Sequence, residues 1–498
     1  MKKLFYLSVI VAAGFISACK KDKKNPDNST SVSNLLKDSV YLYEKEDYLW
    51  FDAIPAYNTF NPRGYSGSTD LAALSNELTA ISQLKINPAT NKPYEYYPLA
   101  PGEAKYSFMD DGTTTASLGG TNGDFGFEPL YIGSDDLRVK YVYPGSPADI
   151  AGIKRGYQIT SINNNTTLTY DDGPNVNFVI NAIYYSKSIT MVLKAPDGTQ
   201  VNASFNVADY TVNPVLTYKV YNEGGGHVVG YIAFNSFTDL TNAKPKLNEA
   251  FNYFISNGVT DLVVDLRYNG GGAGETAEYL DDLIVPAAKT NTLMYTTYFN
   301  SNLQNGNSPL LNKKFGYVAA DYKPSNNQVG FAKALSLAVN RVFFIVTSAT
   351  ASSSELTINN LRPELDVQLV GDTTYGKPVG EIPIPLGSDG KYIMYSPQIY
   401  VENSQNQGDY YAGMAPGSAA YPGKLAGDDV TKDFGDTTEM LLAHALHFVK
   451  TGTYAITQLQ IQSLQAGKQL FSMPQLKAVS RRLDQHKFKP LVINKKRK

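Results

Sequence analysis

The spacing of apolar positions near the start of the chain is helical. Apolar side chains recur three and four residues apart over residues 33–46 and again over residues 70–81. In the second stretch one face would carry Leu71, Leu74, Leu78 and Ile81. The pattern predicts two amphipathic helices, the second with Asp70 as its N-cap. We therefore expect a small, mainly helical region over residues 34–112.

From about residue 113 the spacing of apolar residues shortens to the two-residue period of β-strands. Short runs rich in β-branched and aromatic residues, such as 137–143 and 188–195, alternate with Asn-Gly and Asp-Gly turn signals. Between them, residues 144–163 indicate a strand, a short helix opened by Pro147, a turn and another strand. This pattern predicts a β-rich domain over residues 113–212.

Strands and helices alternate in the largest part of the chain, residues 213–450. Continuous apolar runs predict buried strands at 227–234, 260–267, 341–348 and 366–372, and helical patterns lie at 243–256, from about 354 onward, and at 436–449. This alternation is typical of an α/β layer with a largely parallel sheet. Residues 451–498 combine a Gln-rich helical pattern with a basic end, and we expect an appendage or, over the last dozen residues, a disordered tail.

The first eighteen residues indicate export rather than a folded element. Two lysines precede an apolar stretch that ends at residue 18 and is too short for a comfortable membrane span, so residues 1–18 read as a secretory signal. The sequence Ile-Ser-Ala-Cys at 16–19 resembles a bacterial lipobox, in which the cysteine after the cleavage point carries lipid. The alternative is a plain signal peptide with a chance cysteine, although Cys19 is the only cysteine in the chain.

The lipobox resemblance implies a membrane-anchored protein. Lipid on Cys19 would hold the chain at the bacterial cell envelope, on the periplasmic face of the outer membrane or at the cell surface. Residues 19–33 would then be a polar tether. The formal net charge of −2 gives no reason to expect a nucleic-acid partner.

Ten residues, TSATASSSEL at 347–356, are unusually rich in hydroxyl groups. They follow a predicted buried strand and precede a predicted helix, so their backbone amides and the positive end of the helix dipole could stabilise an oxyanion. One of the hydroxyls could therefore be a nucleophile. The simpler alternative is a helix N-cap, for which Ser354 is the best candidate.

A nucleophilic serine needs a base, and the sequence offers two kinds. Lys377 follows a predicted buried strand, and burial in an apolar pocket favours the neutral amine that can accept a proton. A Ser–Lys dyad is thus chemically reasonable. Among the four histidines, His227 is the alternative base. The chain has no HExxH motif and no clustered metal-ligand spacing, so we expect no metal and no cofactor.

These segments resemble the C-terminal processing peptidases, also called tail-specific proteases. Their serine motif, S/T-A-S-A-S-E, corresponds to TASSSE at 350–355, and their lysine motif, T-F-G-K-G, corresponds to TYGKP at 374–378. The resemblance implies that Ser352 is the nucleophile, with Ser354 as second choice, and that Lys377 is the general base.

A glycine run supplies the third matching segment. The residues VVDLRYNGGG at 263–272 are similar to the family's strand followed by D-L-R-x-N-x-G-G. The resemblance implies an oxyanion hole built from an amide of Gly270 or Gly271 together with the amide of Ser353.

The predicted β-rich domain supplies the fourth. Residues 146–156, SPADIAGIKRG, resemble the PDZ domain in its bacterial protease-associated form. PDZ domains bind a peptide C-terminus by adding it as a strand. The resemblance implies a carboxylate-binding loop at Phe125, Gly126 and Phe127.

Together the four segments cover roughly residues 35–450 in the family's order, and they imply a Clp protease/crotonase-like α/β core with an inserted or preceding PDZ domain. The implied function is that of an exported serine endopeptidase that binds substrate C-termini. Several positions depart from the family, among them Ser353, which replaces the second alanine of the serine motif. The departure that bears most on catalysis is Glu381, which stands where a glutamine often follows the lysine by four residues. A carboxylate there favours the ammonium form of the lysine. A catalytically weak or inactive peptide-binding lipoprotein on the same fold is therefore the alternative.

Overall fold

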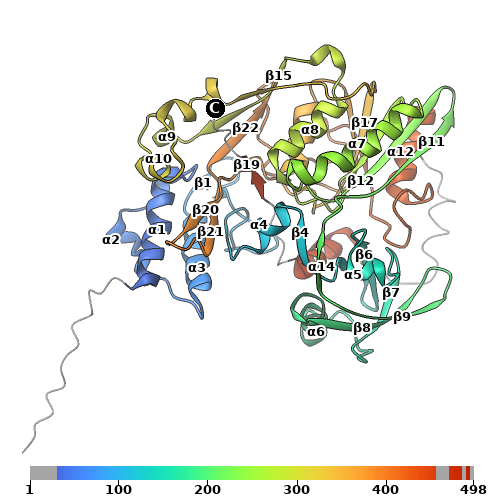
Figure 1. Cartoon of the computed structure of the whole chain (residues 1–498), viewed down its shortest axis with the longest axis horizontal. Coiled ribbons are helices and arrows are strands. Elements are labelled where there is room, and N and C mark those ends of the chain that lie inside the picture. The colour runs from blue at the N-terminus through green and yellow to red at the C-terminus, as the bar shows by residue number, and fades with distance from the viewer. Residues whose placement is uncertain (1–30, 456–469, 485–489, 494–498) are drawn as a thin grey trace, which may run out of the picture.

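The computed structural model describes residues 31–455, 470–484 and 490–493 (Figure 1). The predicted signal segment and Cys19 lie outside the described residues. Among the helices that the model does describe, none has both the length and the apolar composition needed to cross a membrane.

A six-stranded sheet forms the centre of the molecule. Its order is β11 (Val215–Gly224), β12 (His227–Phe234), β13 (Asp261–Asp265), β17 (Arg341–Val346), β18 (Asp366–Gly371) and β23 (Gly423–Leu425). Only the β11–β12 pair is antiparallel, and the other neighbours run parallel. The prediction of a largely parallel sheet is confirmed.

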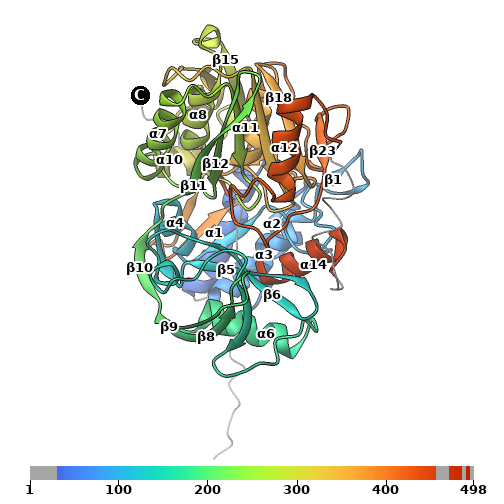
Figure 2. The same ribbon diagram turned by 90° about the vertical axis from the view of Figure 1, so that its right-hand side faces the viewer.

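Helices cover both faces of this sheet (Figure 2). One face carries α7 (Leu240–Ser256), α8 (Gly274–Ile284) and α11 (Ser353–Leu361), and the other carries α12 (Met440–Thr451). Along β17, Phe344 packs toward the first face and Phe343 toward the second. Burial on both faces explains why the strands are continuous apolar runs. The closing helix begins at Met440, later than the predicted residue 436, because Glu439 caps it by accepting from the amide of Leu442.

The sequence did not predict two smaller sheets beside the central one. The first has the order β16 (Gln328–Gly330), β15 (Leu293–Phe299), β22 (Ile399–Asn403) and β19 (Val379–Gly380). The second has the order β20 (Ile384–Leu386), β21 (Tyr392–Tyr395) and β3 (Phe108–Asp110). The remaining short elements are α2 (Tyr57–Phe60), α4 (Thr113–Leu118), α9 (Ser301–Gln304), α10 (Pro309–Phe315), β1 (Ile86–Asn87), β2 (Lys92–Pro93), β4 (Thr121–Asp124) and β10 (Ala208–Thr211).

The two predicted N-terminal helices are present as α1 (Val32–Asp47) and α3 (Asp70–Ser82). Thr69, rather than Asp70, is the N-cap of α3, because its hydroxyl accepts from the amide of Ala72. Leu36, Val40 and Leu78 belong to the same hydrophobic cluster as α7 and the central sheet. The N-terminal region therefore packs as part of the main core.

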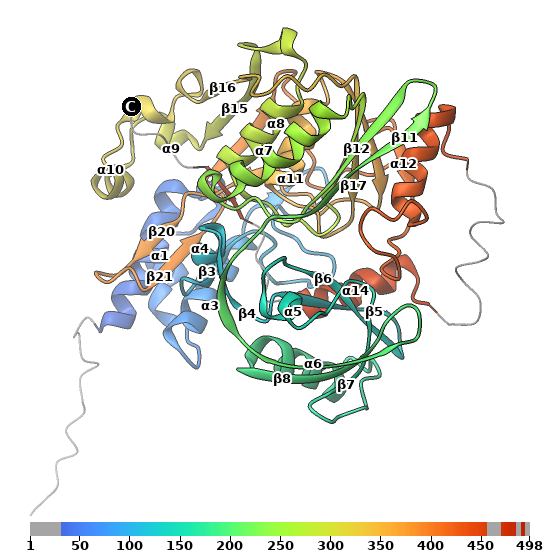
Figure 3. The ribbon, with the colours of Figure 1, turned by 45° about the vertical axis from the view of Figure 1, so that its right-hand side comes forward.

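A five-stranded antiparallel sheet forms a second unit with its own hydrophobic cluster (Figure 3). Its order is β5 (Phe127–Gly133), β6 (Asp136–Val142), β7 (Gln158–Ile162), β8 (Ser188–Lys194) and β9 (Gln200–Asn206). Two short helices, α5 (Pro147–Ile150) and α6 (Pro174–Ile180), complete it. Strand β5 lies at an edge of this sheet.

The described part of the C-terminal extension is not an appendage. Val479 and Leu483 of α14 (Met473–Asp484) are buried in the hydrophobic cluster of the five-stranded unit. Strand β24 (Leu491–Val492) pairs in parallel with β14 (Gly272–Ala273) beside the central sheet. For these residues the sequence-based prediction is wrong, because their contacts are made with segments distant in the chain.

A buried carboxyl in α3 makes the stability of the fold depend on pH. Glu77 has no exposed surface, and burial raises its pKa to about 9, with the charge of Lys37 opposing the rise. The unfolded chain releases this proton near the ordinary glutamate value, so folding stability falls as the pH rises toward 9. We expect Glu77→Gln to remove this loss and to raise the unfolding free energy at pH 8 by up to several kcal/mol. Urea unfolding at pH 5 and pH 8 measures this change in unfolding free energy, with a substitution at the exposed Glu249, Glu249→Gln, as the control. If Glu77→Gln and wild type lose the same unfolding free energy between pH 5 and pH 8, the prediction is wrong.

Candidate active site

Three neighbouring parallel strands bring the predicted site segments to one edge of the sheet. Strand β17 pairs with β13 on one side and with β18 on the other, so their carboxyl ends meet at the same edge. The glycine run 270–272 follows β13, Ser352 follows β17 and Lys377 follows β18. This edge is where open α/β sheets commonly bind ligands.

Ser352 has an unusual backbone conformation. Its φ of 61° and ψ of −116° lie in a region that non-glycine residues rarely adopt. It occupies the N-cap position of α11, which begins at Ser353. Ser354, the cap that the sequence favours, lies inside the helix, and its hydroxyl donates to the carbonyl of Asn269 at 3.0 Å. Positive φ at a buried serine costs free energy, and such strain clusters at functional sites.

The hydroxyl-rich segment binds mainly the loop after β13. The hydroxyls of Thr347, Thr350, Ser353 and Ser354 donate to the backbone carbonyls of Arg267, Leu266, Gly272 and Asn269, respectively. Ser352 differs: its Oγ is buried and has no hydrogen-bond partner among the described residues. Four hydroxyls therefore hold two loops together, and that of Ser352 is left available for chemistry.

Glu355 ties the backbone of Ser352 to that of Lys377. Its Oε2 accepts from the amide of Ser352 at 3.0 Å and from the amide of Lys377 at 2.8 Å. Its Oε1 accepts from the amide of Gly376 at 2.7 Å and from the hydroxyl of Thr374. Because one oxygen binds both amides, the two nitrogens lie no more than two hydrogen-bond lengths apart. Burial raises the pKa of Glu355, and these hydrogen bonds oppose the rise.

Sequence reasoning used Glu355 only to align the serine motif and missed this role. The available signal was its place three residues after Ser352, since a carboxylate there commonly returns to the N-cap amide. Its bonds to residues 374–377 could not be found in this way, because they join segments about twenty residues apart.

Lys377 and Glu381 form a buried pair. The Nζ of Lys377 makes an ion pair with Oε1 of Glu381, and the two side chains are 1% and 0% exposed. The same Nζ lies 5.9 Å from the ring centroid of Tyr106. Burial raises the pKa of Glu381 to about 7, and the positive charge of Lys377 opposes the rise. The departure from the family motif therefore faces the lysine directly.

The glycine run approaches Ser352 so closely that a side chain cannot fit. Gly271 has a φ of +105°, and a Cβ on it would lie 2.6 Å from the Cβ of Ser352. Its amide donates to Oδ1 of Asn269 at 2.9 Å. The backbone carbonyl of Asn269 also accepts from the amide of Ala351 at 3.1 Å. Sequence reasoning missed this asparagine, which joins the glycine run to the serine loop.

The predicted carboxylate-binding loop opens toward the same region. Gly126 has a φ of +79°, and its amide donates to Oδ1 of Asp124 at 2.7 Å. The flanking rings of Phe125 and Phe127 are buried in the five-stranded unit. A cavity of about 780 Å³ is lined both by this loop and by Gly270 and Gly271. The two predicted binding regions thus share one cavity.

His227 is not the base. Its Nδ1 lies 3.1 Å from Oδ2 of Asp261, at the amino-terminal ends of β12 and β13. Ser352 follows β17, which runs parallel to these strands, so it lies at their opposite ends, roughly 20 Å away at about 3.3 Å per residue. The histidine alternative is therefore wrong on geometric grounds.

These observations define an α/β core with a hydroxyl-bearing loop at its carboxyl edge and an attached unit built on a five-stranded antiparallel sheet. Residues 228–416 match the model of peptidase family S41, and residues 138–174 match a PDZ domain. The chain therefore contains a peptidase family S41 domain and a PDZ domain, and the family resemblance seen in the sequence is confirmed.

The curated relatives are carboxyl-terminal processing enzymes. The chain is 27% identical over 233 residues to carboxy-terminal processing protease CtpA of Bacillus subtilis, which covers 47% of this chain and 42% of that protein. It is 30% identical over 254 residues to chloroplastic carboxyl-terminal-processing peptidase 1 of Arabidopsis thaliana, which covers 49% and 44%. The chain thus spans about half the length of the curated relatives it matches.

A solved structure has the same fold. A Bacteroides fragilis protein classed as an S41 protease covers 83% of this chain and 97% of its own, with a TM-score of 0.59 and 22% identity. This similarity agrees with the predicted α/β fold.

Proposed function

We propose that this protein is a serine endopeptidase that processes polypeptides from their C-terminal side. The observation that carries the proposal is the Oγ of Ser352, which has no hydrogen-bond partner among the described residues. Ser352 itself is held at positive φ, and its amide shares a Glu355 oxygen with the amide of Lys377. The S41 match and the names of the relatives support the same reaction class.

The proposed reaction uses two side chains. The Oγ of Ser352 attacks the scissile carbonyl carbon while its proton passes to Nζ of Lys377. The C–N bond then breaks as Lys377 returns the proton to the leaving amine, and water hydrolyses the acyl-enzyme ester. The oxyanion would be held by the amides of Gly270 and Ser353, since the amide of Gly271 is bonded to Asn269.

Substrate would reach this site through the PDZ domain. Strand β5 is an edge strand, which is where a PDZ domain adds a C-terminal peptide. The shared cavity of about 780 Å³ gives a path from Gly126 and Phe127 to the glycines beside Ser352. We further propose that lipid on Cys19 anchors the enzyme at the cell envelope, which metabolic labelling with a fatty acid and a Cys19→Ala variant would test.

Fluorophosphonate labelling tests the proposed nucleophile. Prolonged reaction of the purified protein, followed by digestion and mass spectrometry, should give one adduct, on Ser352. An adduct on Ser354 would move the nucleophile by two residues. An adduct on neither serine would overturn the assignment.

The ion pair of Lys377 with Glu381 favours a second candidate, a peptide-binding protein with little catalysis. An ionised carboxylate stabilises the ammonium form, which cannot accept a proton. Such a protein would bind unfolded polypeptide through its PDZ domain and leave it intact. Incubation with polypeptide and analysis of the products separates the two candidates.

Replacing the carboxylate should leave more of the proposed base in its neutral, proton-accepting form at neutral pH. Glu381 loses its proton as the pH rises through about 7, so its charge opposes deprotonation of Lys377 in the range where a base is needed. We expect Glu381→Gln to move the acid limb of kcat/KM to lower pH by about 1–3 units. A pH profile of each enzyme measures it, with Glu249→Gln as the control. An unmoved acid limb in Glu381→Gln would show that this carboxylate does not govern the base.

A further inference from the structure

Residues 490–493, which contain the strand β24, lie between two segments of the proposed active site. The carbonyl of Pro490 accepts from the amide of Gly272 at 2.8 Å, and β24 continues in parallel register beside β14. On the other side, the amide of Glu381 donates to the carbonyl of Leu491 at 2.8 Å. This segment therefore pairs through its backbone on both sides, as an added strand does.

The same segment packs against Gly271 and Glu381, the residues that contact the two proposed catalytic side chains. A Cβ on Gly271 would lie 2.6 Å from the Cβ of Ser352 and 2.8 Å from the carbonyl oxygen of Pro490. The amide of Leu491 donates to Oε2 of Glu381 at 2.8 Å, and the other oxygen of that carboxylate pairs with Lys377. Ser352 has no exposed surface in this arrangement.

The preceding helix lies along the edge strand of the PDZ domain. α14 packs against β5, and the amide of Phe471, just before it, donates to the carbonyl of Ile132 at 2.8 Å (Figure 3). Val479 and Leu483 are buried in the PDZ hydrophobic cluster. Lys140 of the domain pairs with Asp484 at 3.0 Å. Residue 471 and α14 therefore lie against β5, the edge strand to which a peptide ligand would add.

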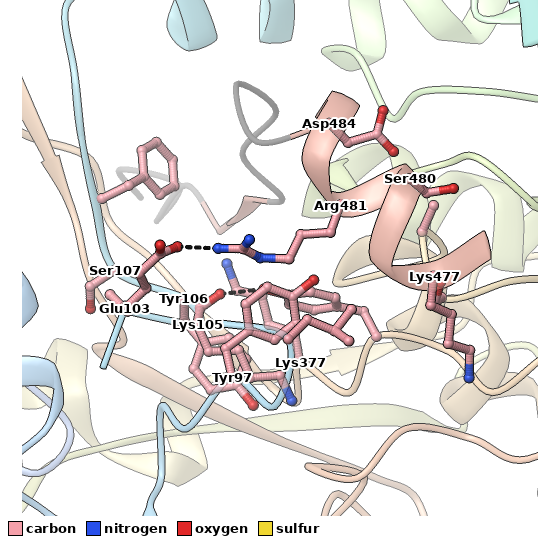
Figure 4. Close-up of a pocket in the computed structure, with 16 residues that line it drawn as sticks. Tyr97, Glu103, Lys105, Tyr106, Ser107, Lys377, Lys477, Ser480, Arg481 and Asp484 are labelled. Carbon is pink, nitrogen blue, oxygen red and sulfur yellow. Dashed lines mark hydrogen bonds and ion pairs between the residues drawn. The ribbon is translucent and has the colours of Figure 1, made fainter. Parts of the chain in front are cut away.

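Helix α14 also closes the pocket that reaches Lys377. A pocket of about 160 Å³ has Ser480, Arg481 and Asp484 on the helix side, and Tyr106 and Lys377 on the other (Figure 4). Arg481 holds the helix there through an ion pair with Glu103.

We propose that the backbone of Gly272, Ala273 and Glu381 is a subsite that binds substrate polypeptide as an added strand, and that residues 490–493 occupy it in cis. Backbone pairing accepts any extended polypeptide, so this subsite suits substrates of varied sequence. A tethered segment competes at a high effective concentration. Substrate must displace the C-terminal segment before it reaches Ser352. The effect on cleavage rests on the proposed function, but the competition for binding does not.

Displacing the segment should expose the serine and the subsite. We expect Leu491→Asp, which puts a charge where the leucine is fully buried, to speed fluorophosphonate labelling of Ser352 at least tenfold. In a Ser352→Ala background, the same change should tighten binding of a fluorescently labelled, unfolded polypeptide by a similar factor. Ala478→Asp, on the exposed face of α14, is the matched control. Unchanged labelling and unchanged polypeptide affinity in a folded Leu491→Asp protein would overturn the inference.

A second measurement needs no change in the C-terminal segment. In full-length Ser352→Ala protein, saturating unfolded polypeptide should speed hydrogen exchange at the amides of residues 491–493. Exchange there that stays unchanged while the polypeptide binds would overturn the inference. If polypeptide releases the segment but no variant with Ser352 is labelled or cleaves, the subsite stands and the proposed function fails.

Discussion

We expect Ser352→Ala to lower the cleavage of an unfolded polypeptide by a thousandfold or more, since removal of an acyl-enzyme nucleophile leaves only residual catalysis. The thermal stability should not fall, because within the described part of the chain the Oγ of Ser352 has no hydrogen-bond partner to lose. Cleavage rates from gel or fluorescence assays and a thermal unfolding scan measure the two effects.

Ser354→Ala is the matched control for this result. The hydroxyl of Ser354 donates to the carbonyl of Asn269, so we expect this variant to lose about 1 kcal/mol of stability but to keep its activity. Equal cleavage by wild type and Ser352→Ala would eliminate the peptidase assignment and leave the peptide-binding protein. Loss of activity only in Ser354→Ala would make Ser354 the nucleophile.

Lys377→Met should have the second largest effect. Methionine keeps most of the length of the side chain but cannot accept a proton, so we expect kcat to fall by about 10²–10⁴-fold with little change in KM. Since the change also leaves Glu381 without its cation, the double variant Lys377→Met with Glu381→Gln separates loss of the base from loss of stability. Steady-state kinetics and urea unfolding of both variants provide the measurements.

His227→Ala is the control for the lysine, because His227 pairs with Asp261 at the opposite end of the strands. It should retain full turnover. Activity that survives Lys377→Met but is lost in His227→Ala would mean that the dyad is wrong.

The strands and the order of the site segments were accessible from the sequence. Buried parallel strands are continuous apolar runs, and β12 begins and ends where its run does. Consecutive parallel strands deliver the loops after them to one edge, so the order of Ser352 and Lys377 along the chain already implied that their loops could meet. The hydroxyl-rich segment 347–356 could also be recognised from the sequence, since a strand followed at once by a helix needs a tight turn between them.

The tertiary structure alone decided which atoms are used. It gave Ser352 its positive φ and left its hydroxyl without a partner among the residues that the structure describes. It also turned Glu381 toward Lys377 and inserted residues 490–493 beside the glycines. None of these features produces a periodic pattern in the sequence. Each depends on backbone groups and buried charges whose partners lie tens or hundreds of residues away, and only the packed fold pairs them.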